Sequence, residues 1–214
     1  MNLFTDAMIA VLILTNLRLI ASSRISACIH AVAWQGVLLG ILPLLVGPHH
    51  LTLRACALSG ATVMLKGFFF PWLLIRALRS TNARREIEPL VSYTLSLLIG
   101  AILLATAMWF GRQLPLPVPT HSPMVLPLAM FNIMVGLFVI VSRRKAITQV
   151  LGYLVMENGI YAFGLAFALN EPSLVELGIL LDAFMAVFVM GITIFHISRE
   201  FDHIDTDRLS ALRD

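Results

Sequence analysis

The sequence predicts an all-α, polytopic helical membrane protein of about seven transmembrane helices. Of the 214 residues, 59% are hydrophobic and 13% are charged, about half of the roughly 25% charged content of a soluble domain. The mean hydropathy is +0.90. A soluble enzyme is excluded, because 15 basic and 12 acidic residues cannot form the polar shell that so many apolar side chains require.

Seven apolar segments are long enough, or nearly so, to cross a bilayer, which takes about 20 residues of helix. They are expected at residues 3–20, 25–46, 51–78, 90–110, 124–141, 147–169 and 174–197. The first segment has no positively charged start and no small-residue cleavage site, so we interpret it as a retained helix and not as a signal peptide.

The positions of Lys and Arg predict the orientation of these helices. With the N-terminus outside and the C-terminus inside, the inner segments hold twelve Lys and Arg residues, whereas the outer segments hold only Arg54 and Arg112. This is the asymmetry of the positive-inside rule. It also accounts for the net charge of +3 without a nucleic-acid site.

The chain is expected to divide into four parts. These are an N-terminal four-helix membrane segment (1–110), a Pro-rich outer loop (111–123), a three-helix segment (124–198) and a cytoplasmic tail (199–214). The prolines of the outer loop favour an extended, polyproline-like path.

Three ionisable residues, Lys66, Glu157 and Asp182, lie near the middle of predicted helices. A charge at the centre of a membrane helix costs about 2.5–3.5 kcal/mol, so such residues usually mark an ion or proton path. Burial favours the neutral form of acids and amines alike, which allows all three to exchange protons near neutral pH. The alternative is a buried ion pair between Lys66 and one carboxylate that only locks helices together.

Polar residues near Glu157 extend this candidate path. Tyr153 and Tyr161 lie four residues before and after Glu157, which places the three side chains on one helical stripe, and Asn158 is adjacent.

Other auxiliary candidates lie on the second and the last predicted helix. Glu176 lies near the outer boundary, where it would suit an entry or exit group. His30 and Gln35 would extend a hydrated path, although a hydrogen bond to a neighbouring helix is the more ordinary role for His30.

The sequence contains no motif for a catalytic centre, a cofactor or a metal. Cys28 and Cys56 form no CxxC pair, and we expect both to be buried apolar side chains. We therefore expect no cofactor and no metal in this chain, and any redox chemistry must come from partner proteins.

The phrases GYLVMENG (152–159) and LVELGILLDAFMAV (174–187) resemble the E-type membrane subunit of hydrogenase-4 and formate hydrogenlyase-like complexes. The helix SGATVMLKGFFFPWLL (59–74), with Lys66, resembles the lysine-bearing helix of that family. The last three predicted helices are also similar to the K-type subunit of respiratory complex I and to the C-type subunit of Mrp cation/proton antiporters.

The resemblance implies a subunit without cofactors in the inner membrane of a bacterial or archaeal cell. It would lie between antiporter-like pumping subunits and the membrane anchor of a peripheral redox arm with iron–sulfur clusters. In the K-type pattern two helices each carry an acidic residue of a lateral proton path. The resemblance places these residues here at Glu157 and Asp182. At the second position this chain has Asp where the K-type subunit has Glu. The role of Lys66 depends on the hydrogenase-4 resemblance alone.

The leading hypothesis is therefore a non-catalytic membrane subunit of an energy-converting, complex-I-like oxidoreductase of the hydrogenase-4 type, which contributes a lateral intramembrane proton path. The alternatives are a component of a multisubunit Mrp-type cation/proton antiporter and a purely structural membrane scaffold.

Overall fold

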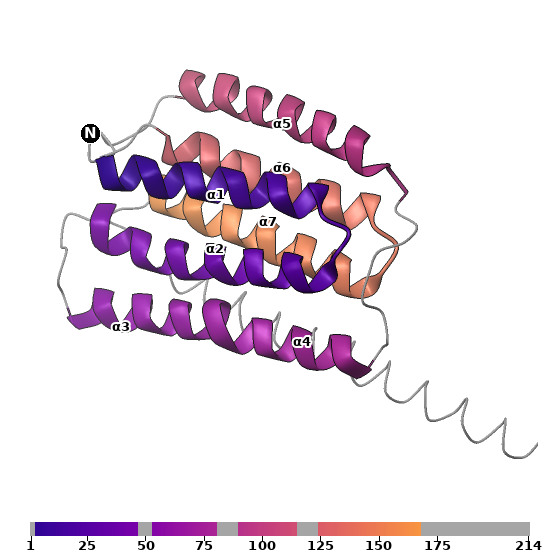
Figure 1. Ribbon diagram of the computed structural model, residues 1–214. Helices are drawn as coiled ribbons and strands as arrows, with labels where there is room; N and C mark the ends of the chain where they lie inside the picture. The colour runs from indigo at the N-terminus through magenta and orange to yellow at the C-terminus, as the bar shows by residue number, and fades with distance from the viewer. Residues whose placement is uncertain (1–2, 47–52, 81–89, 115–123, 168–214) are drawn as a thin grey trace, which may run out of the picture.

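A bundle of long, side-by-side helices makes up the computed structural model, which describes residues 3–46, 53–80, 90–114 and 124–167 (Figure 1). The elements are α1 (Leu3–Ala21), α2 (Ile25–Val46), α3 (Leu53–Thr62), the π-helical segment η1 (Val63–Phe69), α4 (Phe70–Ser80), α5 (Tyr93–Gln113), α6 (Val125–Ser142) and α7 (Ala146–Phe167). No β-strand occurs in these ranges.

The predicted fold class, a polytopic helical membrane protein, is confirmed. Five helical stretches of the described chain are long and apolar enough to cross a membrane: Phe4–Ala21, Ile25–Leu44, Ser59–Arg79, Tyr93–Gln113 and Val125–Ser142. The helix expected at 51–78 is a continuous path through α3, η1 and α4, and the helix expected at 147–169 corresponds to α7. The helix expected at 174–197 lies outside the described residues.

Among the described helices, four form the centre of the bundle. Helix α1 packs against α2 and α6, and α7 packs against α2 and α6, so the four enclose a common interior. Helix α5 covers α1 and α6 along one edge, while α3, η1 and α4 run along the opposite edge against α2 (Figure 1).

Glycines bring the backbones of α6 and α7 together. A Cβ atom added at Gly159 would lie 2.6 Å from the backbone nitrogen of Ile133 and 2.8 Å from the carbonyl oxygen of Ala129, and one at Gly152 would lie 2.9 Å from the carbonyl oxygen of Gly136. Small residues at such contacts are what dispersion-driven packing requires in lipid, where hydrophobic exclusion from water does not act between helices.

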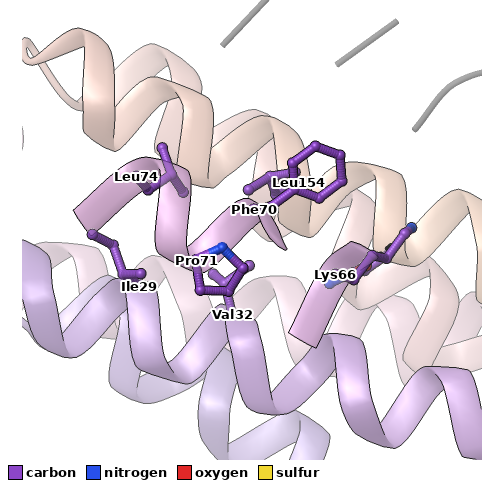
Figure 2. Close-up of a pocket in the computed structure, with 8 residues that line it drawn as sticks. Ile29, Val32, Lys66, Phe70, Pro71, Leu74 and Leu154 are labelled. Carbon is purple, nitrogen blue, oxygen red and sulfur yellow. Dashed lines mark hydrogen bonds between the residues drawn. The ribbon is translucent and has the colours of Figure 1, made fainter. Parts of the chain in front are cut away.

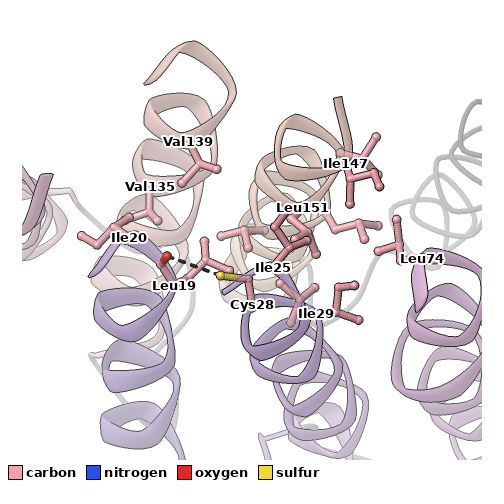
Figure 3. Close-up of a cluster of buried hydrophobic side chains, with 14 of the residues drawn as sticks. Leu19, Ile20, Ile25, Cys28, Ile29, Leu74, Val135, Val139, Ile147 and Leu151 are labelled. Atoms are coloured by element: carbon pink, nitrogen blue, oxygen red, sulfur yellow. Dashed lines mark hydrogen bonds between the residues drawn. The ribbon is translucent and has the colours of Figure 1, made fainter. Parts of the chain in front are cut away.

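Buried side chains from α1, α2, α4, α6 and α7 meet in the main apolar cluster (Figure 3). Cys28 lies within it, with its thiol 3.8 Å from the carbonyl oxygen of Leu19. Cys56 is exposed, so the expectation that both cysteines are buried is wrong for Cys56. Position in an apolar segment does not distinguish the face of a helix that packs inward from the face that points to lipid.

Arg143 joins three helix ends. It follows α6, is only 2% exposed, donates from Nη2 to the carbonyl oxygen of Ile20 at 2.7 Å and lies over the ring of Tyr93 with Cζ 4.6 Å from the ring centroid. The guanidinium thus satisfies a carbonyl at the C-terminus of α1, where a positive charge is favoured. The ends of α1 and α6 and the start of α5 therefore share one end of the bundle, as the predicted alternation requires.

Candidate functional site

The candidate site is centred on Lys66, which η1 carries. At the end of η1 the helical hydrogen-bond ladder is shifted by one residue, because the backbone N–H of Phe70 donates to the carbonyl oxygen of Leu65. Pro71 follows directly and has no backbone N–H to donate to the carbonyl of Gly67. Short π segments of this kind are frequent at functional sites. The chain resumes an α-helix at Phe70.

Glycines on α2 set the depth of Lys66 in the bundle. A Cβ atom added at Gly36 would lie 2.6 Å from Cβ of Lys66 and 2.9 Å from its carbonyl carbon, and one at Gly40 would lie 2.6 Å from Cγ2 of Val63. The spacing of the two glycines is the small-xxx-small pattern that permits close helix approach in membranes. Helix α2 therefore presents a groove in which η1 rests.

Lys66 and Glu157 form a buried ion pair. Nζ of Lys66 lies 2.9 Å from Oε1 of Glu157, and the two side chains are 6% and 2% exposed. Nζ also donates to Oδ1 of Asn158 at 3.3 Å and lies 5.4 Å from the centroid of the Tyr161 ring. Tyr161 in turn shares a side-chain hydrogen bond with Thr62 at the end of α3.

The burial of this pair is only partly compensated. Removing two charges from water is expensive, and their mutual attraction compensates fully only when the remaining polar atoms are also hydrogen-bonded. Oε2 of Glu157 has no hydrogen-bond partner among the described residues. The carboxylate of Glu157 is therefore only partly compensated by hydrogen bonds from the described residues.

A small pocket opens beside the ion pair between α2, η1, α4 and α7 (Figure 2). Lys66 lies at one end and Leu74 at the other. Besides Lys66, its lining is Asn158 and the apolar side chains Ile29, Val32, Phe70, Pro71, Leu74 and Leu154. Its free space suffices for about one water molecule.

The structure brings four of the predicted site residues together: Lys66, Glu157, Asn158 and Tyr161. The buried ion pair that the sequence left as an alternative for Lys66 is present, with Glu157 as the partner. Tyr153, on the same stripe, is half-buried and packs against the apolar cluster instead.

Both auxiliary residues of α2 are placed by the structure, at different locations. Gln35 is fully buried and donates to Asn16 and Thr15 on α1. His30 is exposed, with Nδ1 2.6 Å from the carbonyl oxygen of Ser26, so among the described residues its side-chain contact is within its own helix and not with a neighbouring one. Asp182 and Glu176 lie outside the described residues.

Sequence reasoning missed Asn16 and Asn132, which are fully buried on α1 and α6. Asn16 donates from Nδ2 to Oδ1 of Asn132. Each amide stands inside an apolar segment, so the criterion that selected the ionisable residues would have found both if it had included uncharged polar side chains.

Comparisons with known proteins agree with the resemblance seen in the motifs. Residues 124–214 match the family described as NADH-ubiquinone/plastoquinone oxidoreductase chain 4L. The chain is 34% identical over 204 residues to the uncharacterized protein Rv0085 of Mycobacterium tuberculosis, which covers 95% of this chain and 93% of that protein.

Hydrogenase-4 component E of Escherichia coli is 29% identical over 155 residues, which is 72% of each chain. The Shigella flexneri protein of the same name matches to the same extent. No solved structure matches the chain. The expected resemblance to the E-type subunit and to the K-type subunit of complex I is therefore confirmed.

Proposed function

We propose that this chain provides a lateral proton path within an energy-converting oxidoreductase. The chain belongs to the family of Rv0085. It is a multi-pass membrane subunit of the complex-I-like type and is related to hydrogenase-4 component E. In this role it performs no redox chemistry itself. It passes charge sideways through the membrane, between the anchor of a redox arm and antiporter-like pumping subunits.

The buried pair of Lys66 and Glu157 is the observation that supports this proposal. Its Nζ–Oε1 distance of 2.9 Å is short enough for direct proton transfer, and ionisable residues inside the membrane commonly mark ion or proton pathways. Asn158 and the Tyr161 ring stabilise the ammonium form. The pair can thus exist either as two ions or as two neutral groups, and a charge arriving nearby selects between them.

The path would continue from Glu157 to Asp182 on the helix predicted at 174–197. Redox energy released in the peripheral arm would change the hydration and charge along Lys66, Glu157 and Asp182. The partners would be the redox-arm anchor, the antiporter-like subunits and an arm with iron–sulfur clusters, assembled in a bacterial or archaeal inner membrane.

The first test is a tagged purification from native membranes in mild detergent, with mass spectrometry of the associated proteins. Recovery of a redox arm beside antiporter-like subunits supports the proposal. Recovery of antiporter-like subunits without a redox arm would instead support the alternative, an Mrp-type antiporter.

The second test substitutes Glu157→Gln and Asp182→Asn together and measures proton translocation per assembled complex, because Glu157→Gln leaves Lys66 without its partner and lowers assembly. Translocation per assembled complex is expected to be lost while the redox half-reaction of the arm remains. Unchanged translocation in this double variant would show the path assignment to be wrong.

A second candidate function, a structural scaffold, is favoured by the same ion pair. A Lys–Glu pair that never exchanges its proton would hold η1 against α7 and fix the order of the helices. In that case removal of the charges would lower the amount of assembled complex, and proton translocation per assembled complex would stay unchanged.

A further inference from the structure

Three amide side chains form a buried row across the bundle. They are Gln35 on α2, Asn16 on α1 and Asn132 on α6, and none of them is exposed. Nε2 of Gln35 donates to Oδ1 of Asn16 at 2.8 Å, and Nδ2 of Asn16 donates to Oδ1 of Asn132. Thr15 adds a hydroxyl beside the row, 3.0 Å from Nε2 of Gln35.

The row has an open hydrogen-bonding position at each end. Oε1 of Gln35 and Nδ2 of Asn132 are buried and have no hydrogen-bond partner among the described residues. Buried polar atoms in proteins are almost always paired, and where protein groups do not pair them an ordered water does. A row that served only to hold three helices together would gain nothing from leaving a free acceptor at one end and a free donor at the other.

Both ends of the row lie at the level of the ion pair. Gln35 precedes Gly36, whose backbone packs directly against Lys66. Asn132 lies between Ala129 and Ile133, the two α6 residues that pack against Gly159, two positions beyond Glu157. The amide row and the ion pair therefore occupy one polar layer that crosses α1, α2, α6, η1 and α7.

We propose that Gln35, Asn16 and Asn132 are positioning residues that hold water at the two open ends of the row, and that this water forms a second branch of the proton path, toward the α1 and α6 side of the bundle. The inference rests on the proposed function and extends it. Amide groups do not themselves carry an excess proton at neutral pH. They fix the position and orientation of water molecules that do.

A direct test is a cryo-EM map of the assembled wild-type complex at a resolution that shows ordered water. We expect water density within hydrogen-bonding distance, about 3 Å, of Oε1 of Gln35 and of Nδ2 of Asn132. A map without water density at either atom, with Oε1 of Gln35 and Nδ2 of Asn132 in apolar contact, would overturn the proposal regardless of how any variant behaves.

The functional test uses Gln35→Leu and Asn132→Leu beside Asn132→Ser, which keeps a hydroxyl and leaves room for an additional water. In assembled complexes we expect the leucine variants to lower the rate of proton translocation roughly tenfold, which is the effect of losing about one hydrogen bond, and the serine variant to restore most of it. Ser96→Ala is the matched control, because Ser96 is fully buried on α5 but lies outside the row.

The double variant Lys66→Met/Glu157→Gln in the same assay separates the two proposals, because it removes both charges of the pair and leaves no buried charge without its partner. Loss of translocation in this double variant with wild-type rates in both leucine variants would disprove the branch and leave the main path intact. Wild-type rates in the double variant would disprove the main path itself. Leucine and serine variants that are equally impaired would identify the row as a packing element only.

Discussion

Nζ of Lys66 on η1 lies 2.9 Å from Oε1 of Glu157 on α7, and neither side chain is more than 6% exposed. The attraction between the two charges is the main compensation for the free energy that burying each of them costs. The pair also determines which helices can be neighbours, because α7 and η1 must approach closely enough for the two side chains to meet. The architecture and the proposed function therefore depend on the same contact.

The first prediction concerns removal of one or both of these charges. Lys66→Met or Glu157→Gln alone leaves a buried group without its partner, and such a loss costs about 3–5 kcal/mol. We expect both single variants to assemble poorly, as measured by the amount of tagged chain that copurifies with its complex. The double variant is expected to recover most of the assembly, because no buried charge remains.

Translocation in the double variant then distinguishes a proton path from a scaffold. A complex that assembles but does not translocate protons agrees with a path through the pair. Recovery of both assembly and translocation would support a static scaffold instead.

The second prediction concerns the contact between α2 and η1. In Gly36→Ala the new methyl group would lie 2.6 Å from Cβ of Lys66, and such overpacking costs about 1–3 kcal/mol. The expected result is a lower midpoint for thermal inactivation of the complex in detergent. Gly60→Ala is the control, because nothing lies within 4 Å of its added methyl group. Equal midpoints for the two variants would contradict the close packing of Lys66 on α2.

The third prediction concerns Arg143. Arg143→Gln removes the hydrogen bond to the carbonyl of Ile20 and the contact with the Tyr93 ring, so we expect a loss of stability of about 2 kcal/mol or more. Arg144→Gln changes the net charge equally at an exposed neighbour and is expected to have a much smaller effect. The measurement is thermal unfolding of both variants at the same ionic strength, and similar losses would show that only the charge matters.

The fourth prediction concerns orientation in the membrane. Arg112 and Arg24 are exposed at opposite predicted sides, so single cysteines at these positions report the topology. In a background with Cys28→Ala and Cys56→Ala, we expect an impermeant maleimide added to intact cells to label the Arg112→Cys variant and not the Arg24→Cys variant. The reverse pattern would invert the topology that the Lys and Arg counts predict.

The sequence by itself was sufficient to determine the class of protein and the positions of the described helices. Length and hydropathy are local properties, so each membrane segment can be recognised without knowledge of its neighbours. The same holds for Lys66 and Glu157, because a charge in an apolar segment is exceptional wherever that segment packs. The family motifs are likewise short and contiguous.

Only the tertiary structure decided which side chains meet. Helices that are apolar on all sides carry little periodicity, so the sequence does not show which face points inward. Exposed His30 and buried Gln35 lie on the same helix, and nothing in the sequence separates them. The partner of Lys66, the row through Asn16 and Asn132, and the burial of Arg143 depend on the order and rotation of packed helices, which long-range contacts set.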